Sequence, residues 1–503
     1  RVVTGNMEPE VSRTSKVLAL SLGKTLTTLA SIVFGMIAAR VLSKHDYATM
    51  RQTMLAYSFI APLLMLGLPD ALYYYLPRTQ ERKRGVIIDN LFLILILAIL
   101  FSVFLAAGGY KLLAHRFNNP DLATTLKWMI PYPLYVMPAG ILGAVLLTQN
   151  KTYLLAKYNV LSAVLLAALT ISGVLITKSY SGPLFAQIYF PVLLLPVVLW
   201  LVFKNVPGSF SWPDRKSMTN MLKYAVPLGL AGMISTVMLE TNKIIVSAMC
   251  TPEEFANYVN GVIEIPLIGI ITGSISAVIL VDMTSYVQKG NMTMALDLFK
   301  KAAVKSAVIL FPVMIFLLVS GKSFIVTLYS EKYLESVAPF YIYLFVLPVR
   351  IVIYGSALMA LGQTRVILYR SILDLTINVI LSILLVHLMG YLGAAVATIL
   401  TLYIWTVPFN LYKIARGFNV SMFRTLPLEK LFRIIIICLS VVPLPIIYLL
   451  LFDHIYLIQL LITAVLYFVP LTVLLLRNRM LIIPIAYSKY VPGIIRDKIL
   501  NND

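Results

Sequence analysis

The feature that most constrains this chain is a series of long apolar stretches separated by short charged breaks. About 18 or more mostly apolar residues can cross the hydrocarbon core of a bilayer as a helix. We expect about fourteen such helices in this sequence. They lie near residues 15–39, 47–76, 86–112, 123–149, 156–178, 181–204, 218–249, 254–286, 301–321, 337–362, 365–388, 391–413, 430–452 and 455–477. The predicted fold class is therefore an all-α polytopic membrane protein.

Composition and loop length exclude an attached soluble enzyme. The chain is 60% hydrophobic and 12% charged, and its mean hydropathy is +0.90. The longest interval between apolar stretches is about 15 to 20 residues, which is too short to form an independent core. We therefore expect no catalytic domain, and the two isolated cysteines, Cys250 and Cys438, indicate no metal site.

Charge distribution predicts the orientation of the chain. If the N-terminus is cytoplasmic, 29 of the 41 Lys and Arg residues fall in cytoplasmic segments and 8 fall in outer loops. The positive-inside rule then places both termini in the cytoplasm. Because the net charge of +20 reflects this topology, we expect no nucleic-acid partner, and the basic clusters should contact the headgroups of membrane lipids.

Two short segments at matching places indicate an internal repeat. Ser43 to Asp46 follows the first apolar stretch, and Thr251 to Glu254 follows the seventh, 208 residues later. Both have the Ser/Thr-x-x-Asp/Glu pattern of a capping box, in which the first and last residues stabilise a helix N-terminus. The pair predicts two six-helix lobes. Six is an even number, so the lobes enter the membrane in the same direction and form a parallel pseudo-twofold repeat.

The repeat and the charged breaks together give the expected domain organisation. It consists of a cytoplasmic N-terminal segment at 1–14, an N-lobe at 15–204, a cytoplasmic linker at 205–217, a C-lobe at 218–413, a second cytoplasmic linker at 414–429, two further helices at 430–477 and a cytoplasmic tail at 478–503.

The first third of the chain carries a family resemblance. The residues are Ala39-Arg40-Val41-Leu42-Ser43-Lys44-His45-Asp46-Tyr47, Arg51-Gln52, Gly67-Leu68-Pro69 and Tyr75-Leu76-Pro77-Arg78. This segment resembles the opening of bacterial polysaccharide flippases of the Wzx-like polysaccharide transporter family. That family belongs to the multidrug/oligosaccharidyl-lipid/polysaccharide superfamily. The resemblance, supported by the helix count, covers nearly the whole chain and specifies the superfamily better than the cargo.

The resemblance implies a function that composition does not show. Proteins of this family are expected to have two lobes around a central cavity and to work by alternating access. The implied cargo is an undecaprenyl-pyrophosphate-linked oligosaccharide, moved from the cytoplasmic to the outer leaflet of the bacterial inner membrane. We expect the chain to act as a monomer, with polysaccharide assembly proteins as further candidate partners and without a bound cofactor.

Four embedded cations are candidates for binding the pyrophosphate: Lys24, Arg51, Lys243 and Arg350. Charged side chains within a membrane are costly unless they face a polar cavity or a partner. Structural alternatives remain open for each. Lys24 lies on a face of small residues that suits helix packing, and Arg51 lies near a membrane boundary. Lys243 is three residues from Glu240, and Arg350 has Glu264 or Asp374 as a candidate permanent partner.

Three embedded carboxylates, Asp374, Glu264 and Glu240, are candidates for coupling transport to Na⁺ or H⁺. The resemblance implies such coupling in the multidrug branch, but no diagnostic motif surrounds these residues. Competing functions are an ion-coupled exporter of small molecules, a flippase for a peptidoglycan or teichoic-acid precursor, and a membrane glycosyltransferase or polymerase. The deep cations favour an anionic cargo over the cations that multidrug exporters often carry.

Overall fold

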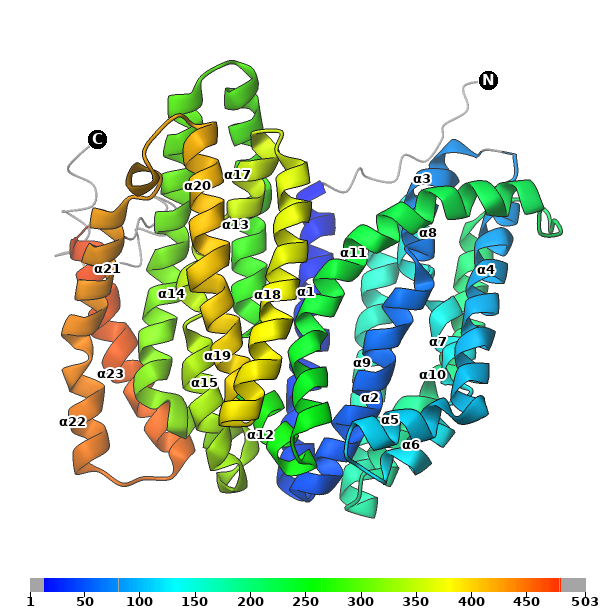
Figure 1. Ribbon diagram of the computed structural model, residues 1–503, viewed down its shortest axis with the longest axis horizontal. Helices are drawn as coiled ribbons and strands as arrows, with labels where there is room; N and C mark the ends of the chain where they lie inside the picture. Colours follow the sequence, from blue (N-terminus) through cyan, green and yellow to red (C-terminus); the bar gives the residue numbers. More distant parts are fainter. Residues whose placement is uncertain (1–12, 80, 264, 479, 481–503) are drawn as a thin grey trace, which may run out of the picture. The chain divides into compact units, whose positions relative to one another are not determined.

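A computed structural model describes residues 13–79, 81–263, 265–478 and 480 (Figure 1). These residues form helices joined by short loops, and they contain no β-strand. The chain divides into two compact units, Arg1–Ala256 and Asn257–Asp503, which are described separately below.

The first unit contains the helices that follow the first seven predicted apolar stretches. They are α1 (Arg13–Val41), α2 (Lys44–Met65), α3 (Leu68–Arg78), α4 (Lys83–Phe104), the π-helical turn η1 (Leu105–Gly109), α5 (Tyr110–Arg116), α6 (Leu122–Trp128), α7 (Tyr132–Ala139), α8 (Leu142–Thr148), α9 (Thr152–Thr177), α10 (Ser181–Asn205) and α11 (Arg215–Met249). Helix α12 (Pro252–Gly261) begins in this unit and continues past its end.

Both predicted capping boxes are confirmed. The Ser43 hydroxyl accepts a hydrogen bond from the backbone N–H of Asp46 at 3.0 Å, at the start of α2. At the start of α12, the Thr251 hydroxyl accepts from the N–H of Glu254 at 3.2 Å, and the Glu254 carboxylate accepts from the N–H of Thr251 at 2.9 Å. These bonds satisfy helix N–H groups that have no partner within the helix.

A glycine pair allows α11 to approach the bend between α2 and α3. Gly67 has a φ of +71°, which L residues with side chains rarely adopt, and the two helices meet there at 40°. A Cβ atom on Gly67 would lie 2.8 Å from the Cα of Gly229 in α11, and one on Gly229 would overlap the backbone of Leu66. The backbones of the two segments therefore touch, which only glycine permits.

The segment between α10 and α11 is fixed to the start of α4. The carboxylate of Asp89, fully buried, accepts from Arg82 Nη1 at 2.8 Å and from the backbone N–H of Asp214 at 2.8 Å. Arg82 also donates to the carbonyl of Trp212 at 2.9 Å. Asp89 therefore holds this connecting segment in place.

The second unit contains the remaining helices. They are α13 (Pro266–Gln288), α14 (Met292–Tyr329), the 3₁₀ turn η2 (Glu331–Ser336), α15 (Val337–Leu344), α16 (Leu347–Arg350), α17 (Tyr354–Ala360), α18 (Thr364–Met389), α19 (Leu392–Leu400), the π-helical turn η3 (Thr401–Thr406), α20 (Val407–Gly417), the 3₁₀ turn η4 (Met422–Arg424), α21 (Leu428–Val441), α22 (Pro443–Leu451) and α23 (Tyr456–Arg477).

Long helix α14 organises one side of the second unit. Both α21 and α23 pack along it, and Figure 1 shows these C-terminal helices beside α14. Two buried side-chain hydrogen bonds fix α23 to α14: Ser320 donates to Thr463 at 3.1 Å, and Ser323 donates to Gln459 at 3.0 Å. Hydroxyl and amide pairs of this kind join helices within apolar surroundings.

Each of the fourteen predicted stretches coincides with a helix or with consecutive helices, which confirms the all-α membrane fold. Within the part of the chain that the structure describes, nine helices are long and apolar enough to cross a membrane, or up to eleven if two bent pairs count as single spans. The total of fourteen spans and the orientation of the termini remain predictions.

Candidate functional site

Arg51 in α2 is held by contacts with its own helix in the first unit. Tyr47, one turn earlier and fully buried, accepts hydrogen bonds from Arg51 Nε at 3.1 Å and from Nη2 at 2.9 Å. A Cβ on Gly35 of α1 would lie 3.3 Å from Nη2, so the glycine leaves room for the guanidinium. Arg51 is therefore a half-buried cation held in one orientation beside α1, and not only a residue at a membrane boundary.

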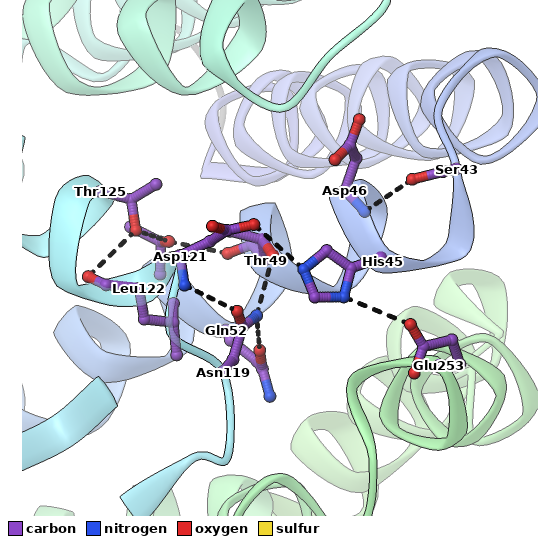
Figure 2. Close-up of polar contacts among 11 residues, drawn as sticks. Ser43, His45, Asp46, Thr49, Gln52, Asn119, Asp121, Leu122, Thr125 and Glu253 are labelled. Carbon is purple, nitrogen blue, oxygen red and sulfur yellow. Dashed lines mark hydrogen bonds and ion pairs between the residues drawn. The ribbon is translucent and has the colours of Figure 1, made fainter. Parts of the chain in front are cut away.

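A buried polar network follows Arg51 along α2, and sequence reasoning did not identify it. Gln52 donates to the Ser247 hydroxyl of α11 at 2.9 Å. Asn119 donates to the Gln52 side-chain oxygen at 2.7 Å and to the Thr49 hydroxyl at 2.8 Å (Figure 2). The sequence signal that could have indicated this network is the run of polar residues in the first turns of α2. This network, which contains no ionisable group, fixes α2 to α11 and to the loop before α6.

His45, at the start of α2, lies between two carboxylates (Figure 2). Its Nε2 is 3.0 Å from Asp121 Oδ2, just before α6, and its Nδ1 is 3.2 Å from Glu253 Oε1, in the first turn of α12. Sequence reasoning treated His45 only as an interior residue of a capping box. Among the residues that the structure describes, no group of three or more His, Cys, Asp or Glu side chains is placed to hold a metal ion.

Glu240 and Lys243 form the ion pair that their spacing predicts. Lys243 Nζ lies 3.0 Å from Glu240 Oε2 on α11, and the two side chains are 34% and 20% exposed. Each therefore neutralises the other at the helix surface. Lys24 lies in α1, and its side chain falls outside the described part of the structure.

Arg350, the last residue of α16, borders a small pocket in the second unit. The pocket is lined mainly by apolar and aromatic side chains, among them Ile268, Phe340, Tyr343 and Leu347. Glu264, a candidate partner of Arg350, lies outside the described residues. The arrangement places Arg350 among the residues that line an apolar and aromatic pocket.

Asp374 in α18 pairs with Arg370, one turn earlier. Its Oδ2 lies 3.5 Å from Arg370 Nε, and its Oδ1 accepts from the Thr406 hydroxyl at 3.0 Å. The residue is 2% exposed. The carboxylate is therefore buried, hydrogen-bonded and beside a cation, which are the conditions under which a membrane-embedded charge is tolerated.

The contacts shown for the predicted residues, Lys24 and Glu264 apart, involve different partners in each unit. In the first unit Glu240 and Lys243 contact each other, whereas Arg51 binds Tyr47. In the second unit Arg350 borders the pocket, and Asp374 lies with Arg370 and Thr406. The pattern that emerges is that the embedded carboxylates Asp89, Glu240 and Asp374 each have a basic partner within two turns of helix.

Comparison with known proteins gives the family. The sequence profile of the family described as "Polysaccharide biosynthesis protein" matches residues 14–280, more than half of the chain. No curated protein matched the chain. The match covers the part of the sequence in which the resemblance was noted, so the predicted family is confirmed.

Solved structures with the same fold are transporters and flippases. Lipid II flippase MurJ in an inward closed conformation is 18% identical, with a TM-score of 0.71, over 92% of this chain and 100% of that chain. An inward-facing multidrug resistance MATE family transporter is 12% identical, with a TM-score of 0.57, over 81% and 99%. A MOP superfamily transporter from Pyrococcus furiosus is 13% identical, with a TM-score of 0.54, over 81% and 97%. The chain therefore belongs to the polysaccharide biosynthesis protein family and shares its fold with these flippase and transporter structures.

Proposed function

We propose that the protein moves an undecaprenyl-pyrophosphate-linked oligosaccharide from the cytoplasmic to the outer leaflet of the bacterial inner membrane by alternating access. Family membership supports a role in polysaccharide assembly, and the fold supports transport. An anionic cargo is favoured by the distribution of embedded charge. The carboxylates Asp89, Glu240 and Asp374 are ion-paired, and Arg350 borders a pocket.

The pocket beside Arg350 suits a ligand with a phosphate next to a sugar. A guanidinium presents two parallel N–H donors to phosphate oxygens, and this contact strengthens where water is excluded. Phe340 and Tyr343 supply aromatic surface beside it. The glycan would occupy the polar interior of the protein, while the lipid tail stays in the bilayer. Arg51 and Lys24 are the corresponding candidate cations of the first unit.

The same charge pattern argues against export of cationic drugs as the main function. A cation exporter needs a carboxylate that its cargo can reach. Asp89 is fully buried and Asp374 is 2% exposed, and each already interacts with an arginine. A cationic drug would have to displace that arginine and leave it buried without its partner, which costs several kcal/mol. Asp374 and Glu264 remain proposed sites for coupling to Na⁺ or H⁺.

Leaflet translocation in proteoliposomes tests the proposal. Purified protein should move a fluorescently labelled undecaprenyl-pyrophosphate-linked saccharide across the bilayer, detected by its exposure to a membrane-impermeant quencher. We expect Arg350→Ala to slow translocation about 10-fold or more, because a hydrogen bond to a charged group contributes about 1.5–3 kcal/mol. Arg350→Lys should recover part of the rate, since the charge remains but the paired donors do not.

Arg365→Ala is the matched control, because Arg365 is an exposed arginine of the same unit. It should translocate at the wild-type rate. Unchanged translocation after Lys24→Ala and Arg350→Ala together would reject the phosphate site. Glycosidic bond formation by the purified protein would reject a flippase and favour a membrane glycosyltransferase.

A further inference from the structure

We propose that His45, Asp121 and Glu253 form a proton-binding site at the end of the first unit, and that the bound proton ties α12 to α2 and α6. The site lies apart from the residues proposed to bind the cargo. Its three side chains come from three separate segments of the chain: the start of α2, the residue before α6 and the first turn of α12 (Figure 2). The inference does not depend on which molecule the protein transports.

The chemistry of the imidazole ring requires the extra proton. Both ring nitrogens of His45 lie within hydrogen-bond distance of carboxylate oxygens, at 3.0 Å and 3.2 Å. An ionised carboxylate only accepts hydrogen bonds, and a neutral imidazole donates from one nitrogen only. Both contacts are therefore satisfied together only when the group of three holds one proton beyond neutral histidine and two ionised carboxylates. With that proton on the ring, both bonds are charge-assisted and so about twice as strong.

The surroundings keep this proton exchangeable and the cluster acidic. The His45, Asp121 and Glu253 side chains are 39%, 43% and 45% exposed, so protons can reach them from water. Asp46 adds a third carboxylate near His45, and Lys44 precedes His45 in the sequence. The carboxylate of Glu254 accepts a hydrogen bond from the backbone N–H of Thr251.

Tyr180 is the remaining titratable group near the cluster. Burial, and then the carboxylates of Asp121 and Asp46, raise the pKa of its phenol, so it stays neutral and supplies no competing charge. Histidine is the residue type that ordinarily gains or loses a proton between about pH 5 and 8, and His45 is the histidine of this cluster.

The neighbouring contacts give the site a mechanical consequence. The Gln52–Ser247 and Asn119–Gln52 hydrogen bonds contain no ionisable group, so α2, α11 and the loop before α6 stay joined at any pH. The bond between His45 and Glu253 adds α12 to this fixed group, and it can form together with the bond to Asp121 only while the extra proton is present. Residues 252–256 of α12 belong to the first unit and the helix continues into the second. The site therefore controls the segment through which the chain leaves the first unit.

Linkage gives the sign of the effect. The tied state holds one more proton than the untied state, so acid favours the tied state and rising pH favours the untied one. For a single proton, the ratio of the two states changes by at most about tenfold per pH unit. When the proton is lost, one of the two carboxylates faces the unprotonated ring nitrogen. Both groups are then hydrogen-bond acceptors, so this contact is no longer a hydrogen bond.

Electron paramagnetic resonance between two spin labels tests the inference without any transported substrate. Labels would be attached at Lys178→Cys, which is exposed, and at Val259→Cys, which is half-buried in α12, in the full chain with Cys250→Ala and Cys438→Ala. Val259 lies six residues after Glu253 on the same helix, and Lys178 lies between α9 and α10. We expect the distance distribution to be narrow at about pH 5.5 and to shift and broaden at about pH 8.5, because histidine is the residue type that ordinarily changes its charge within that interval.

Four variants separate a proton switch from a merely structural histidine. His45→Arg keeps a permanent charge with donors on separate nitrogens, so it should give the narrow distribution at both pH values. His45→Gln cannot donate from two atoms and should give the broad distribution at both. Glu253→Gln offers an N–H to the neutral ring and should weaken the pH response. His115→Gln, at an exposed histidine near the end of α5, should respond as the unaltered labelled protein does.

Three results would overturn the inference. They are an identical distance distribution at the two pH values in the labelled protein with His45 present, a pH response that persists in His45→Arg, and a pH response that disappears in His115→Gln. Each of these three results tests the proton-dependent contact directly and does not depend on transport. A protein that fails to translocate a lipid-linked saccharide but shows the expected distance shifts would contradict only the proposed function.

Discussion

His45 and Glu253 occupy equivalent positions of the two capping boxes, 208 residues apart in sequence, and their side chains lie 3.2 Å from each other. The sequence repeat predicts that the same capping turn occurs twice, once before α2 and once before α12. The structure adds that these two turns meet. The two matching sequence segments are therefore in direct contact through their third residues.

Replacing Gly229 by alanine should destabilise the protein by about 1–3 kcal/mol, because the new methyl group would overlap the backbone of Leu66 in a closely packed region. Gly67→Ala should cost more, since the residue also needs its φ of +71°. Thermal unfolding in detergent, followed by the exposure of buried cysteine, measures both. Gly273→Ala is the control: no atom lies within 4 Å of its Cβ position, so it should leave the melting temperature unchanged or raise it.

Loss of the guanidinium of Arg82 should release the segment between α10 and α11. Arg82→Met leaves the fully buried Asp89 carboxylate without its cation, which should cost about 3 kcal/mol. Limited trypsin digestion measures the release directly, since Arg215 and Lys216 follow this segment and are exposed. Cleavage there should become at least several-fold faster. Lys83→Met removes the same charge one residue away; if it accelerates cleavage equally, the Arg82–Asp89 bond is not the cause.

The sequence predicted the fold well because apolar length and charged breaks are properties of single segments. Each stretch had to be helical, and both capping boxes formed as their spacing indicated. The Glu240–Lys243 pair was predictable for the same reason, since its partners lie on one helix. What remained hidden were bonds between distant segments, such as Gln52 to Ser247 and His45 to Asp121. A local sequence pattern does not indicate which loops contact each other in the folded protein.

The thiol of Cys250 should react slowly with alkylating reagents at neutral pH. Burial, and then the nearby Glu254 carboxylate, raise the pKa of this thiol to about 11. Only the thiolate reacts, so near pH 8 it should react about 100-fold more slowly than an ordinary cysteine, and its rate should rise until about pH 11. Iodoacetamide labelling of a Cys438→Ala protein measures this rate. Met249→Cys, studied with Cys250→Ala, provides an exposed neighbour; equal rates at the two positions would contradict the prediction.

The Glu240–Lys243 pair should show coupled effects on stability. Lys243→Gln or Glu240→Gln alone leaves a half-buried charge without its partner, whereas the double variant leaves none. We expect each single change to cost more than the double change, with a coupling free energy of about 1 kcal/mol. Chemical unfolding of the four proteins in one detergent gives this value. Strict additivity would show that the two side chains do not stabilise each other.

Asp374 is the carboxylate for which a structural role and an ion-coupling role make different predictions. It is 2% exposed, interacts with Arg370 and accepts a hydrogen bond from Thr406. Asp374→Asn keeps the shape and the hydrogen-bond acceptor but removes the charge. If Asp374 couples transport to Na⁺ or H⁺, this variant should lose the acceleration that an imposed ion gradient gives to translocation, while translocation without a gradient continues.

A purely structural Asp374 would produce the opposite pattern. Asp374→Asn would then leave the half-buried Arg370 without its counterion and lower stability by about 1–3 kcal/mol, with the gradient response intact. Asp297→Asn is the matched control, because Asp297 forms a pair of the same spacing with Lys301 at an exposed position of the same unit. It should change neither quantity. Measuring the gradient response and the unfolding temperature on the same preparations therefore distinguishes the two roles, since coupling changes the first and a structural pair changes the second.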